Sequence, residues 1–192
     1  MTDFVKLVHE ARSCRRFIEN EPVSRETLRS IVDCVRTTTS AKNRQPLRYV
    51  SVSEAETRSR IFPHTNWASV LGWGGPPEGE RPTGYILILS VAAPSMPVYC
   101  DMGIAAQTMQ LYAASMGIGC CMLNNFPRDP VREILEIPNE LEILLMLAFG
   151  KPKEERRLLE AKTGENLQYW RDENGVHYVP KMALEQVLLQ ER

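Results

Sequence analysis

The chain has 192 residues, 43% of them hydrophobic, and is therefore long enough to bury one substantial core. Its 23 lysines and arginines nearly balance 24 aspartates and glutamates, and this formal net charge of −1 argues against broad electrostatic binding of nucleic acid. The longest apolar stretch, residues 85–93, is too short to span a bilayer as a helix, and the N-terminus lacks the apolar region of a signal peptide. We therefore expect one domain, residues 1–192, in the cytoplasm, with no nucleic-acid or membrane partner.

The cysteines favour a reducing compartment, because their number, five, is odd and no two form a C-x-x-C pair. The three histidines lie far apart without zinc-like spacing, so no metal site is predicted. Cys120 and Cys121 are adjacent and could be redox-active, but we expect two small buried hydrophobes in a strand.

The first part of the chain predicts two helices followed by a strand. Residues 2–11 place three apolar side chains on one helical face, and Ser24 is a good N-cap for a second helix with apolar residues at helical spacing. Residues 48–53 then alternate in strand fashion. Two polar stretches, residues 11–17 and 40–46, interrupt this pattern.

Residues 63–84 break the pattern, since they hold five glycines, four prolines and two tryptophans. Such a stretch forms no regular element, yet its aromatic residues argue against a disordered linker. We expect either an ordered loop or lid over a site, with Trp67 and Trp73 as walls of the pocket, or a plain surface insertion.

The second half mixes helices and strands without strict alternation. The expected elements are a buried strand at 85–93, a helix at 98–116, a strand at 119–123, a helix at 128–136 and a buried strand at 141–150. A charged tail follows, then the short segment V-H-Y-V at 176–179 and a final helix at about 181–190. This mixture predicts an α+β fold, with a sheet covered by helices.

The candidate chemistry lies in the two polar stretches. The first contains three arginines and a serine, the groups that bind a phosphate through charge-assisted, bidentate hydrogen bonds. The second offers hydroxyl and amide groups, which together suit the edge of a polar heterocycle or a polyol. Taken alone, three arginines are more often a solvated surface, and a stretch such as the second is more often a turn.

Five motifs together resemble the FMN-dependent nitroreductase family, and the resemblance covers most of the chain. In order they are R-S-x-R-x-F at 12–17, S-A-x-N-x-Q-P at 40–46, D-x-G-I-A-A-Q-x-M at 101–109, M-G-I-G-C-C-M-L at 116–123 and L-A-F-G-K-P-K-E-E at 147–155. The resemblance implies a nitroreductase-like α+β fold, with a central mixed, mainly antiparallel sheet flanked by helices. It also implies an intertwined homodimer with FMN bound at the subunit interface and a C-terminal extension over residues 151–192.

The resemblance carries cofactor roles onto three groups of residues. The phosphate and ribityl chain of FMN would contact Arg12, Ser13 and Arg15, with Lys153 as an additional cation, whereas Arg16 would be an outward-facing or structural charge. The flavin of the partner subunit would be reached by Ser40, Ala41, Asn43 and Gln45. Backbone groups near the reactive edge of the ring would come from Leu123, Asn124 and Asn125.

The implied activity is a ping-pong hydride relay, in which NADH or NADPH reduces bound FMN and an electron-poor acceptor, nitroaromatic or quinone-like, is then reduced. The flavin supplies the chemistry, so no side chain need act as an acid or base, and no catalytic residue is assigned. Alternatives are a flavin-destroying or dehalogenating branch of the family, a flavin-binding sensor or storage protein without NAD(P)H turnover, and a structural α+β protein whose arginines are merely solvated.

Overall fold

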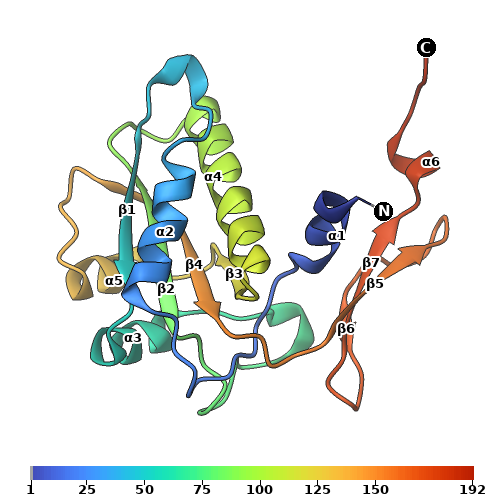
Figure 1. Cartoon of the computed structure of the whole chain (residues 1–192), viewed down its shortest axis with the longest axis horizontal. Coiled ribbons are helices and arrows are strands. Elements are labelled where there is room, and N and C mark those ends of the chain that lie inside the picture. Colours follow the sequence, from blue (N-terminus) through green and yellow to red (C-terminus); the bar gives the residue numbers. More distant parts are fainter. Residues whose placement is uncertain (1) are drawn as a thin grey trace. The chain divides into compact units, whose positions relative to one another are not determined.

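The computed structural model describes residues 2–192, except for the side chain of Ser69, and divides into a first unit that ends at Lys153 and a second unit, Glu154–Arg192. The elements of the first unit (Figure 1) are, in order, α1 (Asp3–Glu10), α2 (Arg25–Val35), η1 (Ala41–Asn43), β1 (Leu47–Val52), α3 (Ala55–Ile61), η2 (Phe62–His64), η3 (Ser69–Leu71), β2 (Gly84–Ser90), α4 (Met96–Ser115), β3 (Gly119–Leu123), α5 (Arg128–Ile134) and β4 (Glu142–Gly150). Those of the second are β5 (Arg156–Ala161), β6 (Trp170–Arg171), β7 (His177–Met182) and α6 (Leu184–Val187).

A four-stranded sheet in the order β1-β2-β4-β3 forms the centre of the first unit, and all of its pairings are antiparallel. Every residue of β2 is buried, as is every residue of β4 from Ile143 onward, because helices cover both faces. The α+β fold with a mainly antiparallel sheet is therefore confirmed. The strands expected at 85–93, 119–123 and 141–150 are also present.

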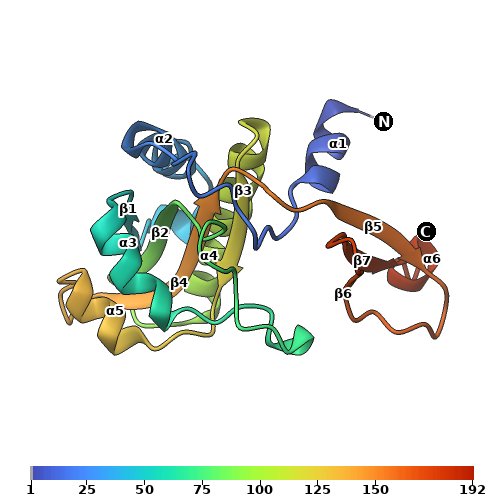
Figure 2. The ribbon, with the colours of Figure 1, turned by 90° about the horizontal axis from the view of Figure 1, so that it is seen from below.

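Successive side chains of β2 enter two different cores, as strand geometry requires. Tyr85 and Leu87 pack with Val131 of α5, whereas Ile86 and Ile88 pack with Leu28 of α2 and with α4. Figure 2 shows α2 and α5 on opposite sides of the strands. Cys120 and Cys121 are each 2% exposed and join these cores, which confirms that they are buried residues of a strand.

The longest helix is α4, whose many alanines let it approach the sheet and α2 closely. It agrees with the helix expected at 98–116, and the expected N-cap also holds, since the Ser24 hydroxyl accepts from the Thr27 N–H. Among the described residues, no helix is both long and apolar enough to cross a membrane.

Two expectations are wrong. The first is the final helix predicted at 181–190, since only the four residues of α6 are helical. Residues 177–182 instead form β7, which pairs in parallel with β5, so the tail that was predicted only as charged contains a small sheet. α6 buries none of its residues, so its apolar side chains have no core to pack against.

The second wrong expectation concerns Trp67, which was expected as a wall of a pocket. Trp67 is 3% exposed and packs against Phe17 and Phe62, so it is a core residue.

Two glycines on neighbouring strands make room for the first polar stretch. Gly119 of β3 is paired with Gly150 of β4. A Cβ on Gly119 would lie 2.8 Å from the side chain of Cys14, and a Cβ on Gly150 would lie 2.8 Å from the ring of Phe17. Residues 13–17 can therefore lie directly on the sheet only because both positions lack a side chain.

Replacing Gly150 by valine is expected to lower the free energy of unfolding by about 2–4 kcal/mol, because the Phe17 ring cannot move without disturbing the core. Urea denaturation monitored by tryptophan fluorescence would measure the change. Gly74→Ala is the matched control, since a Cβ at Gly74 meets nothing within 4 Å. Equal urea midpoints for the Gly150→Val variant and the wild type would show that the close approach of the Phe17 ring to Gly150 does not affect stability.

Candidate functional site

The first polar stretch is fixed by backbone hydrogen bonds on both sides. The N–H of Cys14 donates to the Cys120 carbonyl at 2.8 Å, and the N–H of Phe17 donates to the Glu80 carbonyl at 3.0 Å. Lys153 closes the other side, since its N–H donates to the Arg16 carbonyl at 2.9 Å. The segment therefore has a defined backbone beside the beginning of β3.

The arginines of this stretch have different surroundings. Arg12 is half-buried and donates to the carbonyls of Val8 at 2.8 Å and Ala11 at 3.1 Å, so its guanidinium caps the end of α1. Ser13 and Arg15 are also half-buried, and Ser13 pairs with Cys120 at the start of β3. Both contacts are to backbone carbonyls, and a phosphate contact from the Arg12 guanidinium stays a prediction.

Arg16 has the structural role expected of it. It forms a bidentate ion pair with Glu80, in which Nη2 lies 2.7 Å from Oε1 and Nε also contacts Oε2. Lys153 Nζ lies 3.0 Å from the same carboxylate. These partners, above all the Arg16 hydrogen bonds, lower the pKa of the Glu80 carboxyl group to about 2.

This geometry bears on the predicted role of Lys153. Its ammonium group already contacts Glu80, but its side chain is 48% exposed and the group has three donors. A phosphate contact from Lys153 is thus compatible with the ion pair and stays a prediction. No sequence pattern pointed to Glu80, which lies inside the glycine- and proline-rich stretch at residues 63–84.

A buried carboxylate, to which the sequence motifs assign no role of its own, holds the second polar stretch. Asp101 of α4 is 5% exposed, and its two oxygens accept from the Ser40 hydroxyl at 2.6 Å and the Ala41 N–H at 3.0 Å. The Ser40 hydroxyl oxygen accepts in turn from the Gln45 N–H at 2.9 Å. The signal that could have revealed this contact is that Asp101 is the one charged residue in an otherwise uncharged helix.

The loop that Asp101 holds has an unfavourable backbone. Lys42, Asn43 and Gln45 have φ values of 54°, 51° and 48°, in the left-handed region that residues other than glycine rarely adopt. The Gln45 side chain donates to Asn43 Oδ1 at 3.0 Å, which leaves the Asn43 amide as a donor and the Gln45 carbonyl as an acceptor at the exposed face. The loop therefore presents a fixed pair of complementary polar groups.

Asp101→Ala is expected to lower the free energy of unfolding by about 2–3 kcal/mol, because the Ser40 hydroxyl and the Ala41 N–H lose a charged acceptor. Faster amide hydrogen exchange confined to residues 40–45 would show the local effect. The control is Asp33→Ala on α2, where the carboxylate is 66% exposed and pairs with Arg36. Unchanged amide hydrogen exchange at residues 40–45 in the Asp101 variant would mean that contacts within the loop are sufficient to fix its conformation.

Leu123, Asn124 and Asn125 lie at the other end of β3. Leu123 is buried, whereas Asn124 and Asn125 are exposed. Asn124 lines a groove of about 710 Å³ between α4 and the part of β4 that extends beyond β3. Its walls also include Tyr99, Met102, Gln107, Met122, Arg128 and Leu144.

The predicted residues thus form two groups within one chain. The arginine stretch and the Leu123–Asn125 turn lie at opposite ends of β3, whose five residues span about 13 Å, so an elongated ligand with one anionic end could contact both. The Ser40 loop is apart from them. The loop contacts Asp101 on one face of α4. The groove is lined by Tyr99 and Gly103, which lie two positions before and after Asp101. Two positions correspond to about 200° around a helix, so the loop and the groove lie on opposite faces of α4.

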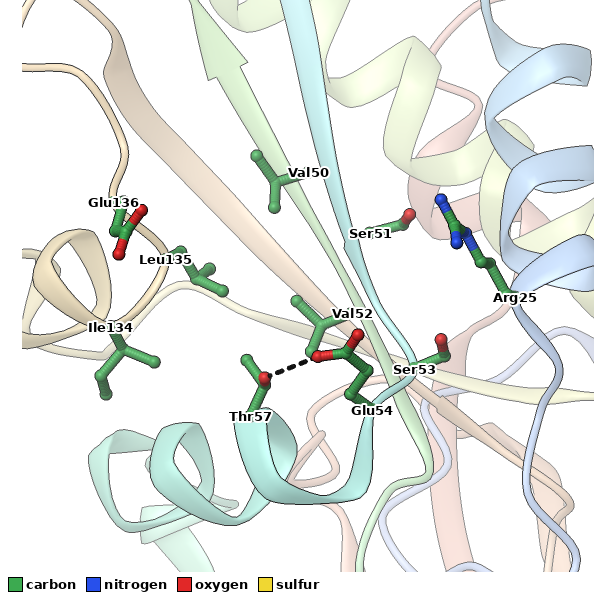
Figure 3. Close-up of a pocket in the computed structure, with 10 residues that line it drawn as sticks. All are labelled: Arg25, Val50, Ser51, Val52, Ser53, Glu54, Thr57, Ile134, Leu135 and Glu136. Carbon is green, nitrogen blue, oxygen red and sulfur yellow. Dashed lines mark hydrogen bonds between the residues drawn. The ribbon is translucent and has the colours of Figure 1, made fainter.

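Another pocket, of about 370 Å³, lies at the free edge of β1 and is shown in Figure 3. Arg25, Glu54 and Glu136 are at its polar rim, and apolar residues of β1 and α5 complete it. None of the predicted cofactor residues lines this pocket, so it is not a candidate for the flavin site. Among the described residues, no cluster of histidine, cysteine or carboxylate side chains could hold a metal ion.

The antiparallel sheet has helices on both faces and an arginine-containing stretch fixed beside one edge strand, which makes this an α+β protein with a candidate anion site at the edge of its sheet. The sequence pattern of the Nitroreductase family matches residues 8–70 and 93–151, well over half of the chain. This protein belongs to that family, as the motifs predicted.

Two relatives share about a quarter of their aligned residues with this chain, and each alignment covers most of it. One from Archaeoglobus fulgidus, named provisionally as an NADH dehydrogenase/NAD(P)H nitroreductase, is 25% identical over 84% of this chain and 92% of its own. An NADPH-dependent oxidoreductase of Staphylococcus epidermidis is 24% identical over 81% of this chain and 67% of its own.

A solved structure confirms the fold. A nitroreductase family protein of Clostridium difficile superposes with a TM-score of 0.63 and 23% identity, over 79% of this chain and 86% of its own.

Proposed function

We propose that this protein is an FMN-dependent oxidoreductase that uses NADH or NADPH. The observation that carries the proposal is the placement of the arginine stretch and the Leu123–Asn125 turn at the two ends of β3, with the groove beside the turn. The names of the A. fulgidus and S. epidermidis relatives, which mention NAD(P)H or NADPH, support the donor. Five free cysteines suit a reducing compartment such as the cytoplasm.

The residues present fit FMN. Arg12, Ser13 and Arg15 offer guanidinium and hydroxyl donors for its phosphate and ribityl chain, and Lys153 adds an ammonium group. Leu123, Asn124 and Asn125 offer backbone groups for the ring, and a backbone N–H near a ring nitrogen would stabilise negative charge that arises there. When bound, FMN supplies a hydride-accepting ring through which NADH or NADPH is oxidised before an electron-poor acceptor, nitroaromatic or quinone-like, is reduced in a ping-pong sequence.

A homodimer is part of the proposal, because one chain does not bring all the predicted groups together. The Ser40 loop, with Ala41, Asn43 and Gln45, would reach the flavin bound to the partner subunit. Exposed apolar side chains on α1 and α4 support such an interface, since Phe4 is 64%, Met96 75% and Tyr99 48% exposed. Contact with a second copy would remove these side chains from water.

The test is the visible spectrum of the purified protein, followed by anaerobic addition of NADH and, separately, of NADPH. A yellow protein that bleaches with either nucleotide supports the proposal and identifies the donor. A yellow protein that bleaches with neither would instead be a flavin-binding protein without turnover. A colourless protein that takes up no added FMN would overturn the proposal.

Steady-state kinetics test the ping-pong sequence. With the identified donor and a quinone as varied substrates, reciprocal plots should give parallel lines. Intersecting lines would mean that donor and acceptor are bound together. Analytical ultracentrifugation of the same sample should show a dimer, and a monomer with full flavin affinity would contradict the shared site.

A further inference from the structure

Arg128, the first residue of α5, holds the turn after β3 through one guanidinium group. Its Nη1 donates to the carbonyls of Asn124 at 2.6 Å and Phe126 at 2.7 Å. Its Nη2 donates to the side chain of Asn124 at 3.0 Å and to the Leu144 carbonyl of β4 at 3.4 Å. The guanidinium also lies over the Phe126 ring, 4.2 Å from its centroid.

Helix stability does not explain a cation at this position. The N-terminus of a helix carries partial positive charge, which disfavours arginine in the first turn. Four hydrogen bonds to the turn and to β4 are therefore the contacts that keep Arg128 in place. Its guanidinium connects the turn to the sheet.

These bonds fix the direction of one backbone donor. A trans peptide is planar, so its C=O and N–H point in opposite directions. Because Arg128 holds the Asn124 carbonyl, the N–H of Asn125 in the same peptide must point away from Arg128. The next peptide is fixed as well, since the Asn125 carbonyl accepts from Asn66 Nδ2 at 3.0 Å and the Phe126 N–H donates to the Asn124 carbonyl at 3.2 Å.

The Asn125 N–H itself is available for a ligand. In the described part of the chain, no hydrogen bond uses it as a donor, and Asn125 is exposed. The peptides on both sides are nevertheless held, so the donor is oriented before any ligand arrives. Such preorganisation is what electrostatic stabilisation of developing charge requires.

We propose that Arg128 is a positioning residue that aims the Asn125 N–H at a ring nitrogen of the bound flavin. The inference rests on the proposed function and adds to it the residue that makes the turn rigid. Arg128 also lines the groove, but the role proposed here requires no contact between its guanidinium and the flavin. Its effect passes through the peptide that joins Asn124 to Asn125.

The test compares amide hydrogen exchange at Asn125, by NMR, with and without FMN. In the wild type, FMN should slow this exchange by about tenfold, the value of one hydrogen bond. Arg128→Met should largely remove that protection while FMN binding persists through the phosphate contacts. Arg128→Lys keeps the charge but lacks the planar fork of donors, so it should behave like the Met variant.

Arg132 provides a matched control on the same helix. Its guanidinium also donates to three carbonyls, those of Ile137, Pro138 and Leu141, but these lie beyond the other end of α5. Arg132→Met should cost stability as Arg128→Met does and leave the Asn125 protection intact. A merely structural role for Arg128 predicts the same result for both variants.

The outcomes separate this inference from the proposed function. A wild type that binds FMN without protecting Asn125, or an Arg128→Met variant that keeps full protection, would overturn the inference alone. A wild type that binds no FMN would overturn both. The midpoint potential of the bound flavin is a second readout, and it should shift in the Arg128 variants but not in Arg132→Met.

Discussion

Replacing Arg12 and Arg15 together by alanine is expected to weaken FMN binding by about 100-fold or more, because each hydrogen bond to a charged group contributes about 1.5–3 kcal/mol. Titration of the apoprotein with FMN, followed by quenching of flavin fluorescence, would measure the dissociation constant. The fold should persist, since the backbone of this stretch is held by the hydrogen bonds of Cys14 and Phe17, which neither substitution removes. Far-ultraviolet circular dichroism of the variant would check this.

The control for this variant removes the same formal charge elsewhere. Arg29 of α2 and Arg60 of α3 are both exposed, so Arg29→Ala combined with Arg60→Ala should leave FMN affinity unchanged. An unchanged dissociation constant in the Arg12 and Arg15 variant would refute the assignment of the phosphate site. An equal loss of FMN affinity in both double variants would point to general electrostatic attraction rather than to a specific phosphate-binding site.

Glu80→Gln is expected to lower the free energy of unfolding at pH 7 by about 3 kcal/mol, because the folded protein holds the pKa of this carboxyl group at about 2, below its ordinary value of 4.5. The carboxylate's contribution is fully present above pH 4.5. It is lost as the pH falls toward 2, where the folded protein also takes up the proton. The difference between wild type and variant should therefore shrink over this range.

Urea denaturation at several pH values between 7 and 2.5 would measure this convergence. Glu21→Gln is the matched control, since the Glu21 carboxylate pairs with Lys151 but is 49% exposed, and such pairs contribute at most about 1 kcal/mol. A constant difference between wild type and Glu80→Gln at every pH would show that the ion pair with Arg16 and Lys153 adds nothing.

The elements that could be predicted from sequence are those whose signal is local. β2 and β4 are continuous apolar runs, α2 begins at a serine N-cap, and α4 has a long helical pattern. Arg16 was separated from Arg12 and Arg15 only through the resemblance to the family. The pattern of charges alone treats the three alike.

The features that could not be predicted depend on contacts between distant segments. Glu80 pairs with Arg16 across 64 residues, and Asp101 holds Ser40 across 61, and neither pairing leaves a local pattern. The misplaced C-terminal helix has the same cause. Residues 177–182 are a strand because β5 pairs with them, and apolar spacing within the segment does not reveal that partner.

The arginine stretch depends on three segments that lie far from it in the chain, namely Glu80, Cys120 and residues 151–153. Each of these contacts closes a long loop, and contacts of this kind form late in folding because of their entropic cost. A partly folded chain therefore lacks the proposed phosphate site. Added FMN should slow unfolding without accelerating refolding, and recovery of the bound cofactor should mark the final step of assembly.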